Sequence, residues 1–277
     1  MNIEHPRSRV HIVKTDNQVE GDFLDFVEIC DKVFHSGLPN FAGCKILIPT
    51  TLNLAEWEIQ LADYEDNSLI DYLKYGWPLG HEGEVWPGNN TKVRNHKGAI
   101  EYPAEIEQYL ENELKEGRIM GPFQSSPFQG PLKVSPLNTV EKKGSLDRRV
   151  ILDLSYPENF SVNEGISKEF FLGEKITLKY PSVDDLCKII CQKGQGCLLF
   201  KRDLSKAYRQ IRVDPGDVRK LGFQWQNNLY TDCVISMGVR SGAFICQRTT
   251  SAVAHEQVYG VLQFLLRPKQ QNSKFSN

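Results

Sequence analysis

The sequence predicts an α+β fold, in which helices and hairpins are mixed. Two segments, 54–64 and 103–116, carry apolar residues at helical spacing. Two others, 136–154 and 221–235, contain paired apolar runs separated by turn-forming residues, which is the pattern of a hairpin. Because the pattern lacks regular βαβ alternation, an α+β architecture is favoured.

Composition bounds the class of protein before any motif is considered. The chain has 277 residues, 40% hydrophobic and 25% charged, which suits a globular protein with one large or two modest domains. Its longest apolar run near the C-terminus, 261–266, is far shorter than the ~20 residues that span a bilayer. The N-terminus lacks the apolar core of a signal peptide. We therefore expect an intracellular protein, cytoplasmic or nuclear, that is not bound to a membrane.

Seven cysteines are scattered along the chain, an odd number without a secretory signal. They predict reduced thiols and not a disulfide framework. Cys187, Cys191 and Cys197 lie close in sequence, but no CxxC pair or nearby histidine accompanies them. Buried thiols are therefore favoured over a zinc site.

Charge is distributed unevenly, despite a net charge of −2. Residues 20–116 contain 19 acidic against 7 basic side chains, whereas residues 131–220 contain 17 basic against 12 acidic. Only the second region is suited to attract a polyanion. The alternative is an uneven surface charge without functional meaning.

The N-terminal part of the chain predicts a mainly helical region. Residues 1–40 show no strong period, and the apolar run within 43–50 predicts a short strand. An amphipathic helix is predicted by apolar residues three, four and three positions apart, which are Leu54, Trp57, Leu61 and Tyr64. A second short helix is predicted over 68–76, and the Gly- and Pro-rich stretch 77–90 predicts a loop.

The central part combines one helix with one hairpin. The helix follows Tyr102, with Pro103 at its first position and Gly117 at its end. Four prolines in 121–136 predict an extended or loop segment. The strands of the hairpin are expected at 136–140 and 149–154, and a loop is expected over 156–180.

A further helix is predicted after Pro181, where Ser182 and Asp185 are spaced like a capping box. Its apolar side chains are expected to face inward: Leu186, Ile189 and Ile190. The segments expected beyond it are a strand ending at Asp203, a helical turn at 214–220, a hairpin at 221–235 and a helix over 241–258.

Asp203 ends the apolar strand that begins at Cys197. A carboxylate at the exposed end of a strand is suited to a divalent cation, because magnesium prefers oxygen ligands held rigidly. The alternative is that Asp203 only ends the strand or caps a helix.

Several unlike motifs occur in order along the chain. They are Ser135-Pro-Leu-Asn-Thr-Val-Glu-Lys-Lys143, Arg149-Val-Ile-Leu-Asp-Leu-Ser-Tyr-Pro157, Ser161-Val-Asn163, Lys201-Arg-Asp-Leu-Ser-Lys-Ala-Tyr-Arg-Gln-Ile211 and Met237-Gly-Val-Arg-Ser241. This series resembles the fingers and the first two palm motifs of a reverse transcriptase. More closely, it is similar to the polymerases of tyrosine-recombinase (DIRS-like) retrotransposons. The resemblance covers roughly residues 40–255, including Asn95-His96 and 117–123.

The resemblance implies a partial right-hand polymerase with fingers and an incomplete palm. The expected divisions are an N-terminal region at 1–95, a fingers-like part at 96–180 and an incomplete palm at 181–277. The implied activity is RNA-directed DNA synthesis by two-metal nucleotidyl transfer, with an RNA/DNA template–primer and a dNTP as partners. The implied cofactor is Mg²⁺.

The resemblance also implies roles for individual residues. Asp203 would be the catalytic metal ligand, assisted by the backbone carbonyl of Leu204. Tyr208 would pack under the incoming sugar, and the remaining residues of that motif expected at the nucleotide are Ser205, Lys206 and Ala207.

Three residues of the flanking motifs complete the implied site. Lys142 and Arg149 would neutralise the triphosphate, and Gly238 would let the backbone approach the nucleotide closely. Considered without the resemblance, Lys142 and Arg149 suit a solvated hairpin face, and Gly238 suits an ordinary turn.

A complete palm needs a third motif, a Tyr/Phe-x-Asp-Asp hairpin after the helix expected at 241–258. The printed sequence has no aspartate beyond Ile235, and its only later acid is Glu256. We therefore expect a chain truncated before this motif and inactive as a polymerase, because loss of metal ligands costs orders of magnitude in rate. The alternative function is a non-catalytic fragment that binds nucleic acid.

Overall fold

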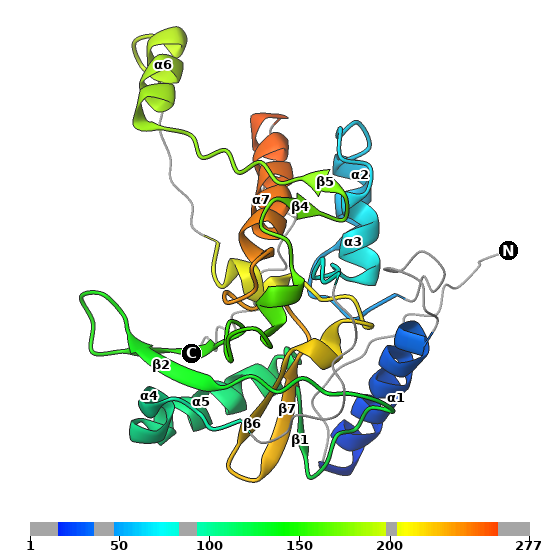
Figure 1. The fold of residues 1–277 in the computed structure, drawn as a ribbon. Coiled ribbons are helices and arrows are strands. Elements are labelled where there is room, and N and C mark those ends of the chain that lie inside the picture. Colours follow the sequence, from blue (N-terminus) through cyan, green and yellow to red (C-terminus); the bar gives the residue numbers. More distant parts are fainter. Residues whose placement is uncertain (1–15, 36–46, 83–92, 198–203, 260–277) are drawn as a thin grey trace, which may run out of the picture.

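The computed structural model describes residues 16–35, 47–82, 93–197 and 204–259 (Figure 1). Its α-helices are α1 (Asp16–His35), α2 (Leu54–Gln60), α3 (Leu69–Tyr75), α4 (Lys97–Glu101), α5 (Pro103–Lys115), α6 (Val183–Lys193) and α7 (Gly242–Tyr259). Its strands are β1 (Ile119–Phe123), β2 (Leu137–Glu141), β3 (Arg148–Leu152), β4 (Phe170–Phe171), β5 (Glu174–Lys175), β6 (Gly222–Trp225) and β7 (Asn228–Asp232). This mixture of helices with antiparallel strands confirms the α+β class. The fingers and palm assignment stays a prediction.

The largest described sheet has the strand order β1-β7-β6 and is antiparallel throughout. The β6–β7 hairpin confirms the prediction for 221–235, and Trp225 faces Asn228 at its turn. Strand β1 was not predicted, because Pro122 lies within it. The register of β1 shifts between Met120 and Phe123, and β1 lies at the edge of the sheet. A proline is tolerated at such an edge, where its missing N–H breaks no ladder.

The β2–β3 hairpin confirms the second hairpin prediction, with a register that pairs Leu137 with Leu152 and Glu141 with Arg148. Helix α4 packs on β2, and α5 packs against both β1 and β3. Helix α5 begins at Pro103, as predicted, and buries Ile106 and Leu110 on one face. The hairpin is thus held by α4 and α5 on the side of the β1-β7-β6 sheet (Figure 1).

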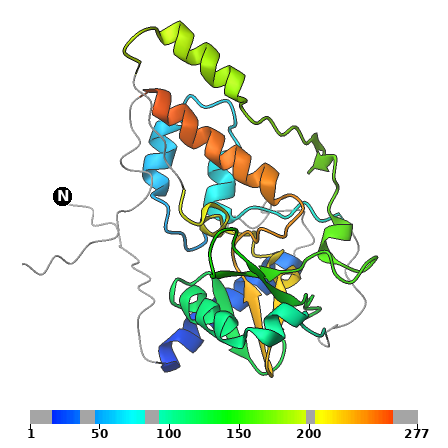
Figure 2. The ribbon, with the colours of Figure 1, turned by 90° about the vertical axis from the view of Figure 1, so that its left-hand side faces the viewer.

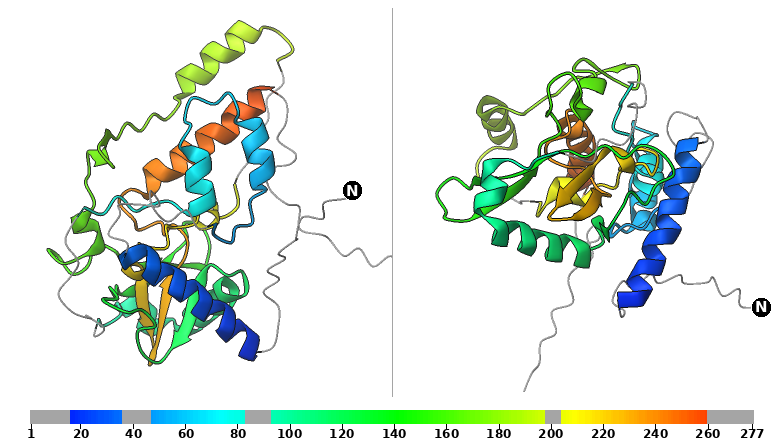
Figure 3. Two further views of the ribbon diagram at one scale, coloured as in Figure 1. Left: turned by 90° about the vertical axis from the view of Figure 1, so that its right-hand side faces the viewer. Right: turned by 60° about the horizontal axis from the view of Figure 1, so that its bottom comes forward.

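A second packing centre lies around Trp77, which is fully buried. Its ring stacks on Tyr72 of α3 with centroids 4.4 Å apart. Its backbone N–H donates to the carbonyl oxygen of Arg212, and it forms an isolated bridge with Val213. Helices α2 and α3 lie beside α7 in this part of the molecule (Figures 1 and 3). The predicted helices over 54–64, 68–76 and 241–258 are confirmed, the first ending earlier than expected.

Helix α1 was not predicted, because residues 1–40 show no strong hydrophobic period. Val27, Cys30 and Val33 are buried on one face of α1, at a spacing of three. Asp31 forms a buried ion pair with Arg219, whose guanidinium lies 3.7 Å from the centre of the Phe34 ring. These contacts form only in the folded molecule, so the local sequence gives a weak signal for them.

Helix α6 forms as predicted, but the prediction for the burial of its side chains was wrong. The capping box between Ser182 and Asp185 is present as predicted. However, the helix buries no residue, and Leu186 and Ile189 are about half exposed instead of facing inward. Figures 1 to 3 show α6 standing away from the rest of the molecule, beyond α7. Its exposed Cys187 and Cys191 are also not the buried thiols that were expected.

Three remaining expectations concern boundaries. Residues 47–50 form no strand, so the described part of the segment predicted at 43–50 lacks one. Most of the strand expected to end at Asp203 lies outside the described residues, as does Asp203 itself. The paired strands β1 and β7 lie on either side of the expected division at 180/181, and the division stays a prediction. Among the described residues, no helix is long and apolar enough to cross a membrane.

Candidate functional site

A cleft of about 690 Å³ lies between α5, the β2–β3 hairpin and the turn at 236–238. Its charged lining residues are Glu105, Glu113, Lys142, Asp147, Arg148, Arg149, Lys206 and Arg209. Five of these side chains are basic and three are acidic. A concave site with surplus positive charge is suited to an anionic ligand.

Four of the residues expected at the nucleotide line this one cleft. Lys142 and Arg149 come from the hairpin, Lys206 from the segment after Asp203, and Gly238 from the turn before α7. These residues belong to four motifs on three separate segments, which the fold brings together. The other expected residues of the 204–208 segment do not line the cleft.

The basic side chains of the hairpin differ in how they are paired. Arg148 donates to Thr139 Oγ1 and to Glu141, and its guanidinium covers the Tyr102 ring. Lys142 lies 3.5 Å from Asp147, which is a loose, exposed contact. The Arg149 side chain is exposed and has no hydrogen bond or ion pair within the described part of the chain. Among the hairpin cations that line the cleft, Arg149 is therefore the one best placed to meet an external anion.

A buried charge network forms the opposite wall. The Glu113 carboxylate on α5 accepts hydrogen bonds from Arg118 at 2.7 Å, Arg209 at 2.9 Å and Lys206 at 3.0 Å. Arg209 also donates to both carboxylate oxygens of Asp232 on β7, at 2.7 and 2.8 Å. The network thus joins α5 and β7 to the segment that follows Asp203.

This network fixes the ionisation of Glu113. Burial alone would raise the pKa of the Glu113 carboxyl. The hydrogen bond from Arg118, the charge of Arg209 and the hydrogen bond from Lys206 outweigh burial and lower that pKa to about 2. The Lys206 side chain is half exposed, and its ammonium bonds Glu113 while the side chain lines the cleft.

Gly238 has a steric reason to lack a side chain. A Cβ atom added at this position would lie 2.6 Å from the carbonyl oxygen of Leu152 at the end of β3. The turn therefore packs directly on the hairpin, and its role towards a nucleotide stays a prediction.

The Gly238→Ala variant tests this contact. We expect the free energy of unfolding to fall by about 1–3 kcal/mol, because the turn or the end of β3 must move to admit the methyl group. Urea denaturation of both proteins measures the difference. Gly242→Ala is the matched control, because Gly242 has no positive φ and a Cβ added there would lie no closer than 3.3 Å to its neighbours. An unchanged stability of Gly238→Ala would show that the turn has room for the methyl group.

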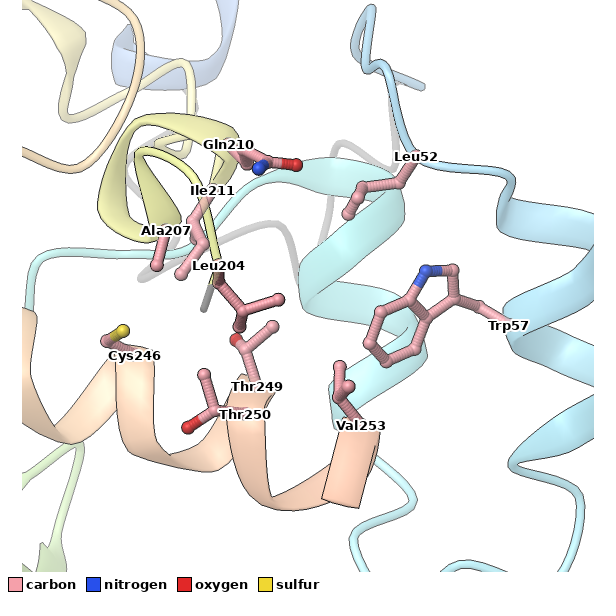
Figure 4. Close-up of a pocket in the computed structure, with 10 residues that line it drawn as sticks. All are labelled: Leu52, Trp57, Leu204, Ala207, Gln210, Ile211, Cys246, Thr249, Thr250 and Val253. Atoms are coloured by element: carbon pink, nitrogen blue, oxygen red, sulfur yellow. The ribbon is translucent and has the colours of Figure 1, made fainter. Parts of the chain in front are cut away.

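Leu204 and Ala207 line a different, smaller pocket between α2, α7 and the 204–211 segment (Figure 4). Its volume is about 50 Å³ and its lining is apolar, with Trp57 and Val253 on the helices. In Figure 4 the Leu204 side chain points towards Thr249 and Thr250. These contacts anchor the segment that follows Asp203 to the core.

The other two expected residues lie beside these. The backbone carbonyl of Ser205 accepts a hydrogen bond from Gln210 Nε2 at 2.7 Å. Tyr208 is half-buried and packs against the core, and burial raises the pKa of its phenol. Whether either residue contacts a nucleotide stays a prediction.

Of the two expected metal ligands, Leu204 is described, whereas Asp203 lies outside the described residues, so their arrangement stays a prediction. Among the residues that the structure does describe, no group of three His, Cys, Asp or Glu side chains is arranged to hold a metal ion. Asp184 and Asp185, two adjacent acids that precede Asp203 in the sequence, belong to the N-terminal turn of α6.

The residues that the sequence analysis missed are Glu113 and Asp232. Each is an isolated acid in a helix or strand, and its partners come from segments far along the chain. Arg209 was part of the quoted motif without a role. A charged residue on the otherwise apolar face of α5, between Leu110 and Leu114, was the available signal for Glu113.

No family model matches the chain, and no curated protein matches it. Among solved structures, it is similar to the foamy viral protease-reverse transcriptase dRH in complex with ds DNA, with a TM-score of 0.45 and 16% identity. That match covers 95% of this chain and 39% of the other. The native prototype foamy virus protease-reverse transcriptase gives a TM-score of 0.41 and 14% identity, over 75% of this chain and 28% of the other.

The chain therefore spans well under half the length of these two structures. At TM-scores below 0.5, the likeness alone assigns neither an activity nor a ligand to it. Membership of the DIRS-like group also stays a prediction.

Proposed function

We propose that the chain is a reverse-transcriptase-like domain that binds a nucleoside triphosphate and a template–primer duplex in the cleft between α5 and the β2–β3 hairpin. One observation carries the proposal. Lys142, Arg149, Lys206 and Gly238 were selected from four motifs on three separate segments of the fold, and all four line the same cleft. A common ligand requires such an arrangement, because residues far apart in sequence must reach one site.

The charges of the cleft support an anionic ligand. The Glu113 carboxylate is neutralised by its buried basic neighbours, whereas the Arg149 side chain has no partner among the described residues, so five basic side chains outweigh the exposed acids Glu105 and Asp147 in the cleft. A planar guanidinium can bind a phosphate through two parallel hydrogen bonds, and the Lys142 ammonium adds a point charge beside it. Phosphate contacts of this kind give affinity without sequence readout.

Magnesium belongs to this proposal, with Asp203 and the backbone carbonyl of Leu204 as its ligands. When bound, the ion would neutralise the phosphates and support nucleotidyl transfer. Among the described residues, no group of three His, Cys, Asp or Glu side chains adds to these two ligands. Because the printed sequence lacks a Tyr/Phe-x-Asp-Asp motif, we expect binding without primer extension from this chain alone.

The Arg149→Ala variant tests the binding site. Fluorescence anisotropy of a labelled DNA primer on an RNA template, titrated in salt from 50 to 200 mM, gives the affinity and its salt dependence. We expect a loss of roughly three- to tenfold in affinity and a salt slope that is shallower by about 1, since one phosphate contact is removed. Lys142→Ala should weaken binding in the same direction.

Lys188→Ala is the matched control, because Lys188 is an exposed cation on α6 that lies outside the cleft. It should leave both the affinity and the slope unchanged. Equal effects of Lys188→Ala and Arg149→Ala would place binding elsewhere on the surface. A primer-extension assay with magnesium then separates the alternatives. Incorporation that disappears in Asp203→Ala indicates a working polymerase, and its absence with binding retained indicates a non-catalytic binding fragment.

A further inference from the structure

We propose that Asn163 is a positioning residue, which sets the backbone of residues 237–240 along the floor of the cleft. The inference rests on the proposed function, because it concerns the part of the bound nucleotide that this turn would meet. Asn163 lies in the loop after β3, far in sequence from residues 237–240, and it is 4% exposed.

The Asn163 side chain joins its own loop to the turn through both ends of its amide. Its Nδ2 donates to the backbone carbonyl of Gly238 at 2.8 Å, and its Oδ1 accepts from the backbone N–H of Arg240 at 2.8 Å. The same Nδ2 donates to Ser155 Oγ at 2.8 Å. The amide therefore pairs with the turn as a second backbone strand would.

Two further contacts hold the same turn. Arg240 Nη1 donates to the carbonyl of Ile166 at 2.8 Å, so the loop and the turn are tied twice. On its other side, Gly238 packs so closely on Leu152 that no Cβ fits between them. The turn is thus fixed between the end of β3 and Asn163, and it cannot shift without breaking one of these contacts.

Only an asparagine has both the donor and the acceptor that this arrangement needs, on a side chain of the right length. A serine or alanine cannot span both bonds, an aspartate has no N–H to donate to Gly238, and a glutamine is longer by one methylene. Leaving the Gly238 carbonyl or the Arg240 N–H without a partner in a half-buried site would favour movement of the turn.

The position of this turn divides the cleft by chemistry. Lys142 and Arg149 on the hairpin offer charge, which suits phosphates, whereas Ser236, Met237 and Gly238 offer backbone and small or apolar groups. We therefore assign the turn to the uncharged sugar and base of the nucleotide. Asn163 should govern recognition of the nucleoside and leave phosphate binding to the hairpin.

Two ligands separate these parts: dATP, which carries a nucleoside, and inorganic tripolyphosphate, which does not. Isothermal titration in the presence of magnesium gives both affinities. For Asn163→Ala we expect the affinity for dATP to fall roughly tenfold and the affinity for tripolyphosphate to fall less than about twofold, because two hydrogen bonds to the turn are lost. Asn163→Ser, a smaller change, should show the same selectivity if Asn163→Ala folds poorly.

The matched control is Thr231→Val, which removes another buried hydrogen bond, from Thr231 Oγ1 to the Val218 carbonyl at 2.7 Å, away from the cleft. It should destabilise the protein without changing the ratio of the two affinities. An equal ratio change in Thr231→Val, or equal losses of both ligands in Asn163→Ala, would reduce Asn163 to a purely structural role. If wild-type protein binds dATP and Asn163→Ala binds it equally well, this inference alone is wrong. If wild type binds neither ligand, the proposed function fails first.

Discussion

Arg209→Ala is expected to lower the free energy of unfolding by about 3–5 kcal/mol, because it leaves a buried carboxylate without its partner. Asp232 is 1% exposed, and its two oxygens receive hydrogen bonds from the Arg209 guanidinium. Glu113 would keep Arg118 and Lys206, whereas Asp232 would keep no ion pair that the structure describes. Urea denaturation followed by circular dichroism measures the change.

The double variant Arg209→Met with Asp232→Leu provides the control for this prediction. Replacing both members of a buried pair by apolar residues is often neutral or stabilising, so the double variant should be more stable than Arg209→Ala alone. A cost below about 1 kcal/mol for Arg209→Ala would mean that water or another cation reaches Asp232. A double variant no better than the single one would mean that packing, and not charge, sets the cost.

Asp214 is expected to make the protein less stable as the pH rises from about 4 to 7. The residue is 3% exposed, and its Oδ2 atom has no hydrogen-bond partner among the described residues. Burial, followed by the charge of Asp217, raises the pKa of the Asp214 carboxyl to about 7, against the N–H of Gly216 and the charge of Lys220, which lower it.

Stability falls as the pH rises because the pKa of the Asp214 carboxyl is higher in the folded protein than in the unfolded chain. Below about pH 4 the carboxyl is protonated in both states, so it contributes no pH dependence. Between about 4 and 7 the unfolded chain loses the proton while the folded protein retains it, and the folded state is disfavoured progressively. The full loss, which persists above pH 7, is roughly 4 kcal/mol, since one pKa unit corresponds to about 1.4 kcal/mol.

Denaturation at a series of pH values checks this expectation. Asp214→Asn cannot ionise, so its stability should fall less between pH 4.5 and 7.5 than that of the wild type, by a few kcal/mol. Asp63→Asn, a substitution of an exposed aspartate, should follow the wild type across the series. Parallel curves for Asp214→Asn and wild type would show that Asp214 ionises in the folded protein as it does in the unfolded chain.

Local sequence patterns predicted the elements whose signals are local. Helix α5 carries its own start at Pro103 and its own apolar stripe, and the β6–β7 hairpin carries Asn227 in the two-residue turn between Trp225 and Asn228. The prediction failed where contacts with residues far along the chain determine the structure. Strand β1 was not predicted because it contains Pro122, and its partner β7 is distant in sequence. Leu186 of α6 is apolar at helical spacing, but within the described molecule it packs on no other element.

The candidate site divides in the same way. Lys142, Arg149, Lys206 and Gly238 could be selected from motifs and do share a cleft. The contacts that shape that cleft could not be selected. Glu113 meets Arg209 across α5 and the 204–211 segment, and Asn163 meets Gly238 across two loops, so neither pairing leaves a periodic trace in the sequence.

The pairing of β1 with β7 also has a consequence for how the chain reaches its fold. Ile119 lies opposite Asp232, and Trp77 bridges to Val213, so each of these pairings closes a loop of more than a hundred residues. Closing long loops costs entropy before any contact repays it, and folds rich in such contacts form slowly. During synthesis, β1 must wait for β7 to leave the ribosome, with an open strand edge in the interval. In the newly made chain β1 is therefore a strand without its partner until β7 is made, and Pro122, which lacks an N–H, limits the pairing of its edge with other chains.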